Sequence, residues 1–361
     1  MKIAGFDIGG ANTDLAIVDF DEKTHEIKNI ATDFEYLPMW SNKEDLGDTL
    51  LNLIQRTDDD GINSIDGIGI SMTAELVDAY ETKKEGVLDI ANKVENIFND
   101  IFSKDSSKNI PIAFIGTKNV LSIEELKTNP LEIAAANWIA TAQIATKIDP
   151  NSIFVDIGST TTDIIPVKDG KECAKGRSDY ERLATGELVY TGTLRTNLAS
   201  FLDNICFGGK DFNVASELFA ITADVYNVLD KIGIDDYVCH TCDGAGKSKE
   251  ESARRISRVL CADLDILPFA DIVEISKYIH KKQVQQIAES LDKVAKRENL
   301  DVVITTGLGK DILAKRAANV LNLEIKSMNE LLTDEECVVA PAIGTAVMVE
   351  KYLTKFNHII K

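Results

Sequence analysis

The sequence predicts an α/β protein made of two related halves with a cleft between them. The first observation is a repeated motif, because residues 7–14 read DIGGANTD and residues 156–163 read DIGSTTTD. In both copies an aspartate ends an apolar run, a turn of small residues follows, and a second aspartate opens another apolar run. Each copy therefore predicts a β-hairpin with a tight turn. The second observation is that this motif is the only internal repeat, which is consistent with one copy in each half.

The turns of both hairpins predict phosphate binding. Backbone N–H groups exposed by such a turn form a concavity for phosphate oxygens, and an aspartate at its rim can hold a hydrated metal ion. One small-residue turn between strands is common, but a matched pair requires the same turn chemistry twice. The expected phosphate-binding residues are Gly9, Gly10, Ala11, Asn12, Thr13, Gly158, Ser159, Thr160, Thr161 and Thr162, and the expected metal-binding residues are Asp7 and Asp156.

Three other segments carry recognisable patterns. Residues 302–309 read VVITTGLG, an apolar strand that leads into a Gly-x-Gly turn, and a helix is expected from about Lys310. The turn lacks the glycine spacing of a Walker loop, and an ordinary strand-to-helix turn is the alternative. Residues 131–146 and a segment that starts at Pro341 predict helices rich in small residues, which allow close helix crossing. Proline suits the first turn of a helix.

Together these motifs resemble the actin, sugar-kinase and heat-shock-chaperone ATPase superfamily. The resemblance implies two actin-like, ribonuclease-H-like domains around a central cleft, with the two small-residue helices crossing at the hinge. It also implies that residues 302–309 form an adenosine loop. We expect the first domain at residues 1–147 plus 341–361, and the second at 148–340 with a helical insertion at about 214–293.

The apolar runs outside these motifs predict the other strands and helices and their order. In the first half we expect helices near residues 43–58 and 90–102, and strands at 67–71 and 111–116. In the second half we expect a strand at 324–327, after the Gly-x-Gly turn. These alternating strands and helices are typical of α/β proteins.

Composition and charge narrow the class of protein. The chain of 361 residues is 44% hydrophobic and 27% charged, as in soluble globular proteins. Its net charge of −20 argues against nucleic-acid binding, whose footprint is basic. No segment predicts a signal peptide or a membrane span. We therefore expect a cytoplasmic protein that binds small molecules, and the sequence leaves its oligomeric state open.

Segments outside the hairpins narrow the resemblance further. They read AAANW at 134–138, GTLRT at 192–196, TCDG at 241–244 and CAD at 261–263, with three arginines between residues 254 and 258. With the hairpins, these segments resemble hydantoinase/oxoprolinase-like proteins linked to tetrahydromethanopterin C1 pathways, over nearly the whole chain. The sequence departs from the family pattern in TCDG, where the family has Thr-Ala-Asp-Gly.

This resemblance implies a transferase of archaeal methanofuran biosynthesis, in which the phenol of γ-glutamyltyramine displaces diphosphate from an aminomethylfuran-methyl diphosphate. Asp7 and Asp156 would orient Mg²⁺, which stabilises the leaving diphosphate together with the loop amides. Asp14 or Asp163 would accept the phenol proton. Because the substrate arrives activated, ATP is possible as a cofactor but not favoured. The expected substrate-binding residues are Arg195, Asp243, Arg258, Thr306, Gly307, Gly309 and Asn137.

Other functions and sites stay open. The chain is alternatively an ATP-dependent small-molecule kinase or a hydantoinase/oxoprolinase-like hydrolase, or a nucleotide-bound regulator without catalysis. Cys239 and Cys242 have metal-ligand spacing, but the second Cys-x-x-Cys pair of a zinc site is missing, so buried thiols are expected. Trp40 and Trp138 are expected to pack in the core or at the hinge.

Overall fold

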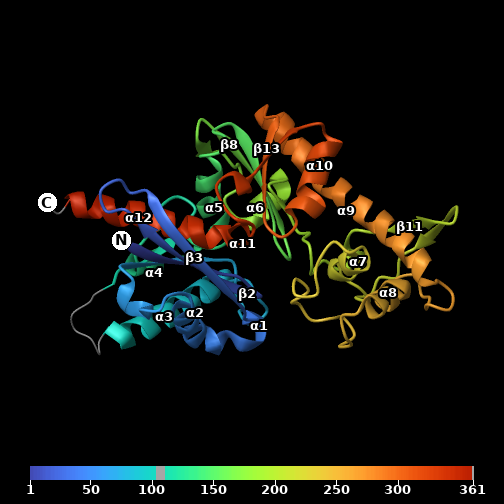
Figure 1. Cartoon of the computed structure of the whole chain (residues 1–361), viewed down its shortest axis with the longest axis horizontal. Coiled ribbons are helices and arrows are strands. Elements are labelled where there is room, and N and C mark those ends of the chain that lie inside the picture. The colour runs from blue at the N-terminus through green and yellow to red at the C-terminus, as the bar shows by residue number, and fades with distance from the viewer. Residues whose placement is uncertain (103–109, 360–361) are drawn as a thin grey trace.

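The computed structural model describes residues 1–102 and 110–359, which form two α/β halves and a smaller third lobe (Figure 1). The first half contains a six-stranded sheet in the order β3-β2-β1-β4-β5-β6. Its strands are β1 (Lys2–Ile8), β2 (Asn12–Phe20), β3 (Ile27–Tyr36), β4 (Gly67–Met72), β5 (Ile112–Ile115) and β6 (Val120–Leu121). Strand β1 pairs antiparallel with β2 and parallel with β4.

The second half repeats this arrangement. Its sheet has the order β10-β8-β7-β13-β14, and β9 pairs with β8. The strands are β7 (Ser152–Ile157), β8 (Thr162–Lys168), β9 (Lys171–Glu172), β10 (Leu188–Val189), β13 (Val302–Thr306) and β14 (Glu324–Ser327). The run β8-β7-β13-β14 matches β2-β1-β4-β5, because each is an antiparallel hairpin followed by parallel strands. The predicted α/β fold of two related halves is confirmed.

Helices cover both faces of the first sheet. Helices α2 (Leu46–Thr57) and α3 (Lys83–Phe102) form one core with Phe6 and Leu15, whereas Val18 enters the core on the opposite face. This division follows from the alternation of side chains along a strand. Other helices are α1 (Met39–Asn42), α4 (Ile123–Thr128), α5 (Asn137–Ala145), α6 (Asp179–Thr185), α7 (Thr222–Val228), α8 (Lys249–Arg258), α9 (Phe269–Glu298), α10 (Lys315–Val320), α11 (Asp334–Val338) and α12 (Ala340–Ile359).

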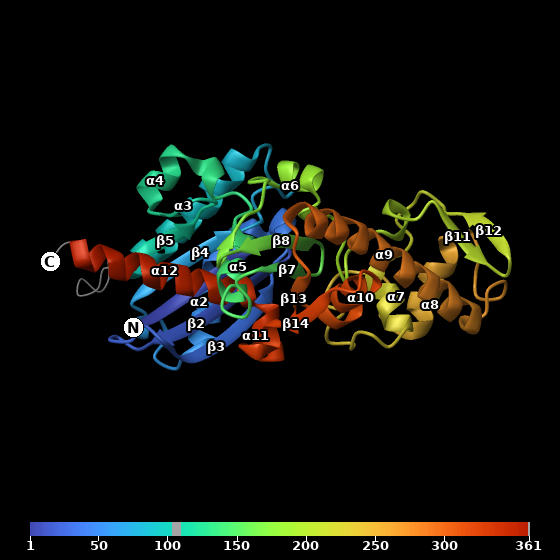
Figure 2. The same cartoon turned by 90° about the horizontal axis from the view of Figure 1, so that it is seen from above.

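The small-residue helices α5 and α12 join the two halves (Figure 2). One buried core contains side chains of both helices, Val18 of the first sheet, and Phe154 and Ile304 of the second. Helix α12 packs against α5 and β1. At the helix crossing, a Cβ on Gly344 would lie 2.3 Å from the carbonyl oxygen of Ala140. This close approach of two backbones therefore requires glycine.

Most predicted elements are confirmed, with shifted ends. The helix expected at 131–146 begins only at Asn137, because Pro130–Glu132 forms a 3-10 turn and Ala135 has a φ of 52°. Helix α3 begins earlier than expected, at Lys83. The helix expected from Lys310 starts with a turn of π-helix before α10.

The stretch expected to be helical at residues 214–293 is only partly helical, and it belongs to the third lobe. This lobe contains the hairpin β11 (Asn204–Phe207) and β12 (Lys210–Asn213) together with α7, α8 and α9, and it projects away from the second sheet (Figures 1 and 2). Residues 229–248 form turns rather than helix. This stretch contains three glycines, and Ser248 forms the capping box that starts α8.

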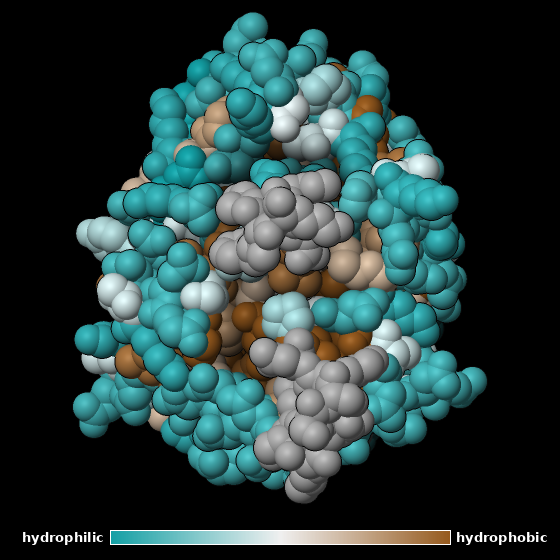
Figure 3. Space-filling model, turned by 90° about the vertical axis from the view of Figure 1, so that its left-hand side faces the viewer, coloured by the Kyte–Doolittle hydropathy of each residue, from teal (hydrophilic) through white to brown (hydrophobic). Residues whose placement is uncertain are grey.

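In the face shown in Figure 3, hydrophilic residues cover most of the surface, and apolar residues gather in a hollow near its centre. Within residues 1–102 and 110–359, no helix is long and apolar enough to cross a membrane.

We expect Gly344→Ala to destabilise the protein by about 1 to 3 kcal/mol, the usual cost of overpacking. The added methyl group would meet the α5 backbone and force the two helices apart. Thermal unfolding measures the loss. The control is Gly47→Ala in α2, whose Cβ would make ordinary contact with Ile97 at 3.4 Å. Equal midpoints for both variants would contradict a tight crossing.

Candidate phosphate-binding cleft

A cavity of about 900 Å³ lies between the two halves and is lined by both hairpin loops. The first half contributes residues 9–12 and the second contributes residues 158–161. The four hairpin aspartates, Asp7, Asp14, Asp156 and Asp163, also line the cavity. The structure therefore brings together the two motifs that are 149 positions apart in the sequence (156 − 7).

Both loops have the same backbone geometry. In the first hairpin Asp7 pairs with Asp14 across the strands, and in the second Asp156 pairs with Asp163. In the first loop the amide of Gly9 donates to the carbonyl oxygen of Asn12 at 2.8 Å. In the second loop the amide of Gly158 donates to the carbonyl oxygen of Thr161 at 3.1 Å. In the described part of the chain, the loop amides with no acceptor include those of Gly10, Ala11, Ser159, Thr160 and Thr161. These N–H groups are available to an anion.

The segment that follows β10 holds the second loop in place. The amides of Thr193 and Leu194 donate to the carbonyls of Gly158 and Ser159, both at 2.9 Å. A Cβ on Gly192 would lie 2.5 Å from the amide nitrogen of Thr160, so this approach also requires glycine.

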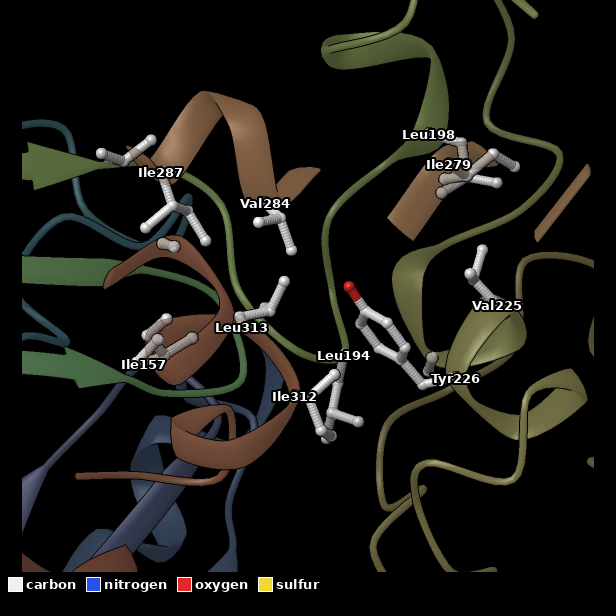
Figure 4. Close-up of a cluster of buried hydrophobic side chains, with 14 of the residues drawn as sticks. Ile157, Leu194, Leu198, Val225, Tyr226, Ile279, Val284, Ile287, Ile312 and Leu313 are labelled. Carbon is white, nitrogen blue, oxygen red and sulfur yellow. The ribbon is translucent and has the colours of Figure 1, made fainter. Parts of the chain in front are cut away.

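Apolar packing supports both the second phosphate loop and the segment after β10 that contacts it. Figure 4 shows Ile157, which ends β7, in one buried cluster with Leu194, Tyr226, Leu313 and side chains of α9. Since Leu194 directly precedes Arg195, its packing also fixes the backbone from which the Arg195 side chain extends.

The four aspartates have different partners. Asp7 accepts hydrogen bonds from Ser71 Oγ at 2.7 Å and from Asn137 Nδ2 at 3.1 Å. Asp163 forms an ion pair with Arg182, whose guanidinium also lies 4.6 Å from the ring centre of Trp138. The side chains of Asp14 and Asp156 form no hydrogen bond or ion pair with any of the described residues. Half of the cluster therefore has free carboxylate oxygens.

Burial and mutual repulsion raise the pKa of these carboxyl groups. For Asp14, burial is the larger cause, followed by the charges of Asp7 and Asp156, and its pKa lies well above the usual 3.8. Burial and the charges of Asp163 and Asp7 act in the same way on the pKa of Asp156. Carboxylates that repel one another favour a bound cation between them.

The donor chemistry fits a hydrated cation rather than one ligated only by protein. Among residues 1–102 and 110–359, no three His, Cys, Asp or Glu side chains come close enough to hold one metal ion directly. The free oxygens of Asp156, and the lone pairs of Asp7 that Ser71 and Asn137 leave open, can accept hydrogen bonds from metal-bound waters instead. Mg²⁺ usually keeps several waters and uses one or two carboxylates.

Contacts across the mouth of the cleft link the halves. The Arg195 guanidinium lies 4.9 Å from the ring centre of Trp40, and its Nη1 donates to Thr160 Oγ1 at 3.4 Å. A second contact between the halves is the ion pair in which Lys83 Nζ lies 3.4 Å from Asp179 Oδ2. These contacts place one cation next to the second phosphate loop and hold another between the two halves.

Several expected site residues lie outside the cleft lining. Asp243 is held by Arg255 at 3.1 Å and Arg258 at 3.2 Å in the third lobe, so these groups stabilise that lobe. Thr306 is buried, and its Oγ1 donates to the Cys337 carbonyl at 3.2 Å. A Cβ on Gly309 would lie 2.5 Å from Ile157, so this glycine serves packing. Of the expected substrate-binding residues, those that line the cleft are Arg195, Asn137 and Gly307.

Two threonines expected to bind phosphate are also placed elsewhere. Thr13 and Thr162 are fully buried and do not line the cleft, because they stand at strand positions beside the turn. Thr162 Oγ1 donates to the Thr191 carbonyl at 2.7 Å and so anchors the segment that supports the second loop.

Some cleft residues were not predicted. Arg182 lies in α6 and is 2% exposed, and only its partner Asp163 belongs to a recognisable motif. Trp40 was expected in the core or at the hinge, yet it lines the cleft and is 37% exposed. Phe34 and Tyr190 also line the cleft. A single aromatic or arginine in a polar segment forms no sequence pattern, so the sequence could not indicate that these residues line the cleft.

The cysteines form no site of their own in the described residues. Cys239 is buried and Cys242 is half-buried, and burial raises the pKa of both thiols to about 11. Cys261 is exposed.

The topology and the paired hairpins define an actin-like protein with two halves around a cleft. The chain belongs to the hydantoinase/oxoprolinase family, whose model matches residues 66–352. It is 41% identical over 358 residues to a (4-{4-[2-(gamma-L-glutamylamino)ethyl]phenoxymethyl}furan-2-yl)methanamine synthase of Methanocaldococcus jannaschii, covering 98% of this chain and 99% of that protein. A Methanococcus vannielii protein of the same name is 38% identical over 219 residues, covering 60% of this chain and 98% of that protein.

A solved structure supports the fold. The nucleotide-free structure of acetone carboxylase, from work on ATP-dependent acetone carboxylation, has a TM-score of 0.59 and 11% identity. It covers 96% of this chain and 70% of that chain. At this identity the likeness concerns the fold alone.

We expect Asp14→Asn to raise the thermal stability of the metal-free protein at neutral pH. The pKa of Asp14 is raised in the folded state, so the folded protein loses stability as the pH rises through that pKa. Asparagine removes this loss, and the gain should vanish as the pH falls below 3.8, where the carboxyl group is neutral in both states. Unfolding midpoints measured from mildly acidic to neutral pH test the sign. Asp265→Asn, at an exposed position, is the control, and a lower midpoint for Asp14→Asn at neutral pH would contradict the repulsion.

Proposed function

We propose that this chain is an enzyme that forms the aryl ether bond of the product named in both relatives, (4-{4-[2-(γ-L-glutamylamino)ethyl]phenoxymethyl}furan-2-yl)methanamine. The observation that carries the proposal is the pair of matched hairpins that face one cleft, in a chain 41% identical to such a synthase over nearly its whole length. The phenol oxygen of γ-glutamyltyramine bonds to the methylene carbon of an aminomethylfuran-methyl diphosphate. The bond from that carbon to diphosphate breaks, and the diphosphate leaves with the electron pair.

The two loops would bind the diphosphate. The unpaired amides of Gly10 and Ala11 face it from the first half, and those of Ser159 and Thr160 face it from the second. Such donors are most valuable where negative charge collects on the leaving group. A hydrated Mg²⁺ ion, held by Asp7 and Asp156 through its waters, would neutralise further charge there.

Asp14 is the better candidate for the base that takes the phenol proton. Asp163 is tied to Arg182, whereas the carboxylate of Asp14 is unpaired in the described chain. The pKa of Asp14 is also raised well above 3.8, which brings it nearer to the pKa of a phenol, about 10. The proton would pass from the phenol oxygen to the Asp14 carboxylate as the ether bond forms.

ATP is not required in this proposal. The loop after β13 offers few free polar side chains, since Thr306 bonds to Cys337 and Lys310 Nζ lies 2.6 Å from Asn329 Oδ1. A diphosphate ester is already activated, so no phosphoryl transfer must precede the displacement. The cleft beyond the loops would then hold the organic parts of the two substrates.

We expect purified, nucleotide-free protein to form the ether and release diphosphate from an aminomethylfuran-methyl diphosphate and γ-glutamyltyramine without ATP. Chelation of Mg²⁺ should stop the reaction. Product is measured by mass spectrometry and diphosphate by a coupled colour assay. A strict requirement for ATP, with ADP formed in proportion to product, would support the alternative of an ATP-dependent kinase or hydrolase instead.

We expect Asp7→Asn and Asp156→Asn each to lower kcat by about 10²- to 10³-fold, the cost of losing one electrostatic contact to the leaving group. Both variants should keep the far-ultraviolet circular dichroism of the parent, because neither carboxylate holds the sheets together. The control is Asp265→Asn, which is exposed and far from the hairpin motifs in sequence. Near-normal rates for both cleft variants at saturating Mg²⁺ would disprove the role of the hairpins.

A further inference from the structure

An exposed aromatic wall stands beside the acidic floor of the cleft. Among the residues that line the cavity, Phe34 is 48% exposed, Trp40 is 37% exposed and Tyr190 is 66% exposed. Phe34 belongs to β3 and Trp40 to α1, at the edge of the first half that faces the third lobe (Figure 1). Large apolar side chains left open in a concave site usually indicate a ligand or partner.

The wall begins where the phosphate site ends. Arg195 lies over the face of Trp40, and the same guanidinium reaches Thr160 of the second phosphate loop. In the described cleft lining the other cation is Arg182, which is buried against Asp163. Arg195 therefore marks the boundary between an anion site and an aromatic site.

The exposure of these side chains indicates where in the cleft the furan ring and the phenol ring can lie. The floor holds Asp7, which is 6% exposed, and the loop amides. A furan ring is one methylene from its diphosphate, so it must lie next to that floor. Phe34 and Trp40 line the same cavity but are much more exposed, so they lie nearer to solvent than the floor does.

We propose that Phe34 and Trp40 form an aryl subsite that holds the phenol ring of the acceptor, with Arg195 at its inner edge. The inference rests on the proposed function, because it takes γ-glutamyltyramine as the acceptor. Ring-on-ring contact orients the phenol oxygen toward the reacting carbon. The Trp40 ring also keeps the guanidinium of Arg195 beside the second loop.

Steady-state kinetics with each substrate varied in turn test the subsite. Phe34→Leu should raise KM for γ-glutamyltyramine by about tenfold, the scale of a lost aromatic contact, and should leave KM for the furan substrate within about twofold. Trp40→Leu should raise KM for γ-glutamyltyramine to a similar extent, and it should also raise KM for the furan substrate because it removes the ring that holds Arg195. Trp40→Phe should restore most of the loss, since it keeps a ring. The control is Phe269→Leu in α9, an aromatic that is 40% exposed outside the cleft lining, and its kinetics should match the parent.

A binding measurement separates this inference from the proposed function. Calorimetric titration of γ-glutamyltyramine into parent protein that holds Mg²⁺ and inorganic diphosphate should give binding that Phe34→Leu weakens and Phe269→Leu does not. No ether from the parent protein would overturn the proposed function. Ether formation by the parent, with an equal effect of Phe34→Leu on both KM values or an effect of this variant on kcat alone, would overturn the aryl subsite.

Discussion

Four buried carboxyl groups at the floor of the cleft impose the main constraint on this structure. Asp7 and Asp14 pair across one hairpin, and Asp156 and Asp163 pair across the other, so the two hairpins bring all four carboxylates into one site. Burial raises the pKa of all four, and nearby carboxylates raise it further, which are other cluster members for Asp7, Asp14 and Asp156 and Asp179 for Asp163. The fold must hold these groups together against their repulsion, and an anion can bind among them only together with a cation.

Rigid packing behind the loops meets that constraint. The strands of each hairpin lie within a sheet, and the helices α5 and α12 pack between the sheets in a single buried core. Because Gly344 brings the α12 backbone against Ala140, the halves cannot slide at the crossing without opening this core. Away from this core, the halves are linked by the partly exposed ion pair of Lys83 and Asp179, which is a weaker kind of contact.

The network behind the second loop explains why distant residues matter to the site. Gln283 on α9 is fully buried and donates to the Thr191 hydroxyl at 2.9 Å and to the Gly192 carbonyl at 2.8 Å. It accepts a hydrogen bond from the hydroxyl of Tyr226 at 2.5 Å. The long helix α9 therefore supports the segment that carries Arg195, which connects the third lobe to the phosphate loop.

The hairpins, both phosphate loops and the duplicated α/β halves could be predicted because their information is local. An aspartate, a small-residue turn and a second aspartate specify the strand pairing and the exposed amides within eight residues. What only the tertiary structure decided was the partner of each group: that Arg182 neutralises Asp163, that Asp243 belongs to the third lobe, and that Trp40 faces the cleft. Side-chain partners come from segments far apart in the chain, and burial and charge select among them only after the sheets have packed.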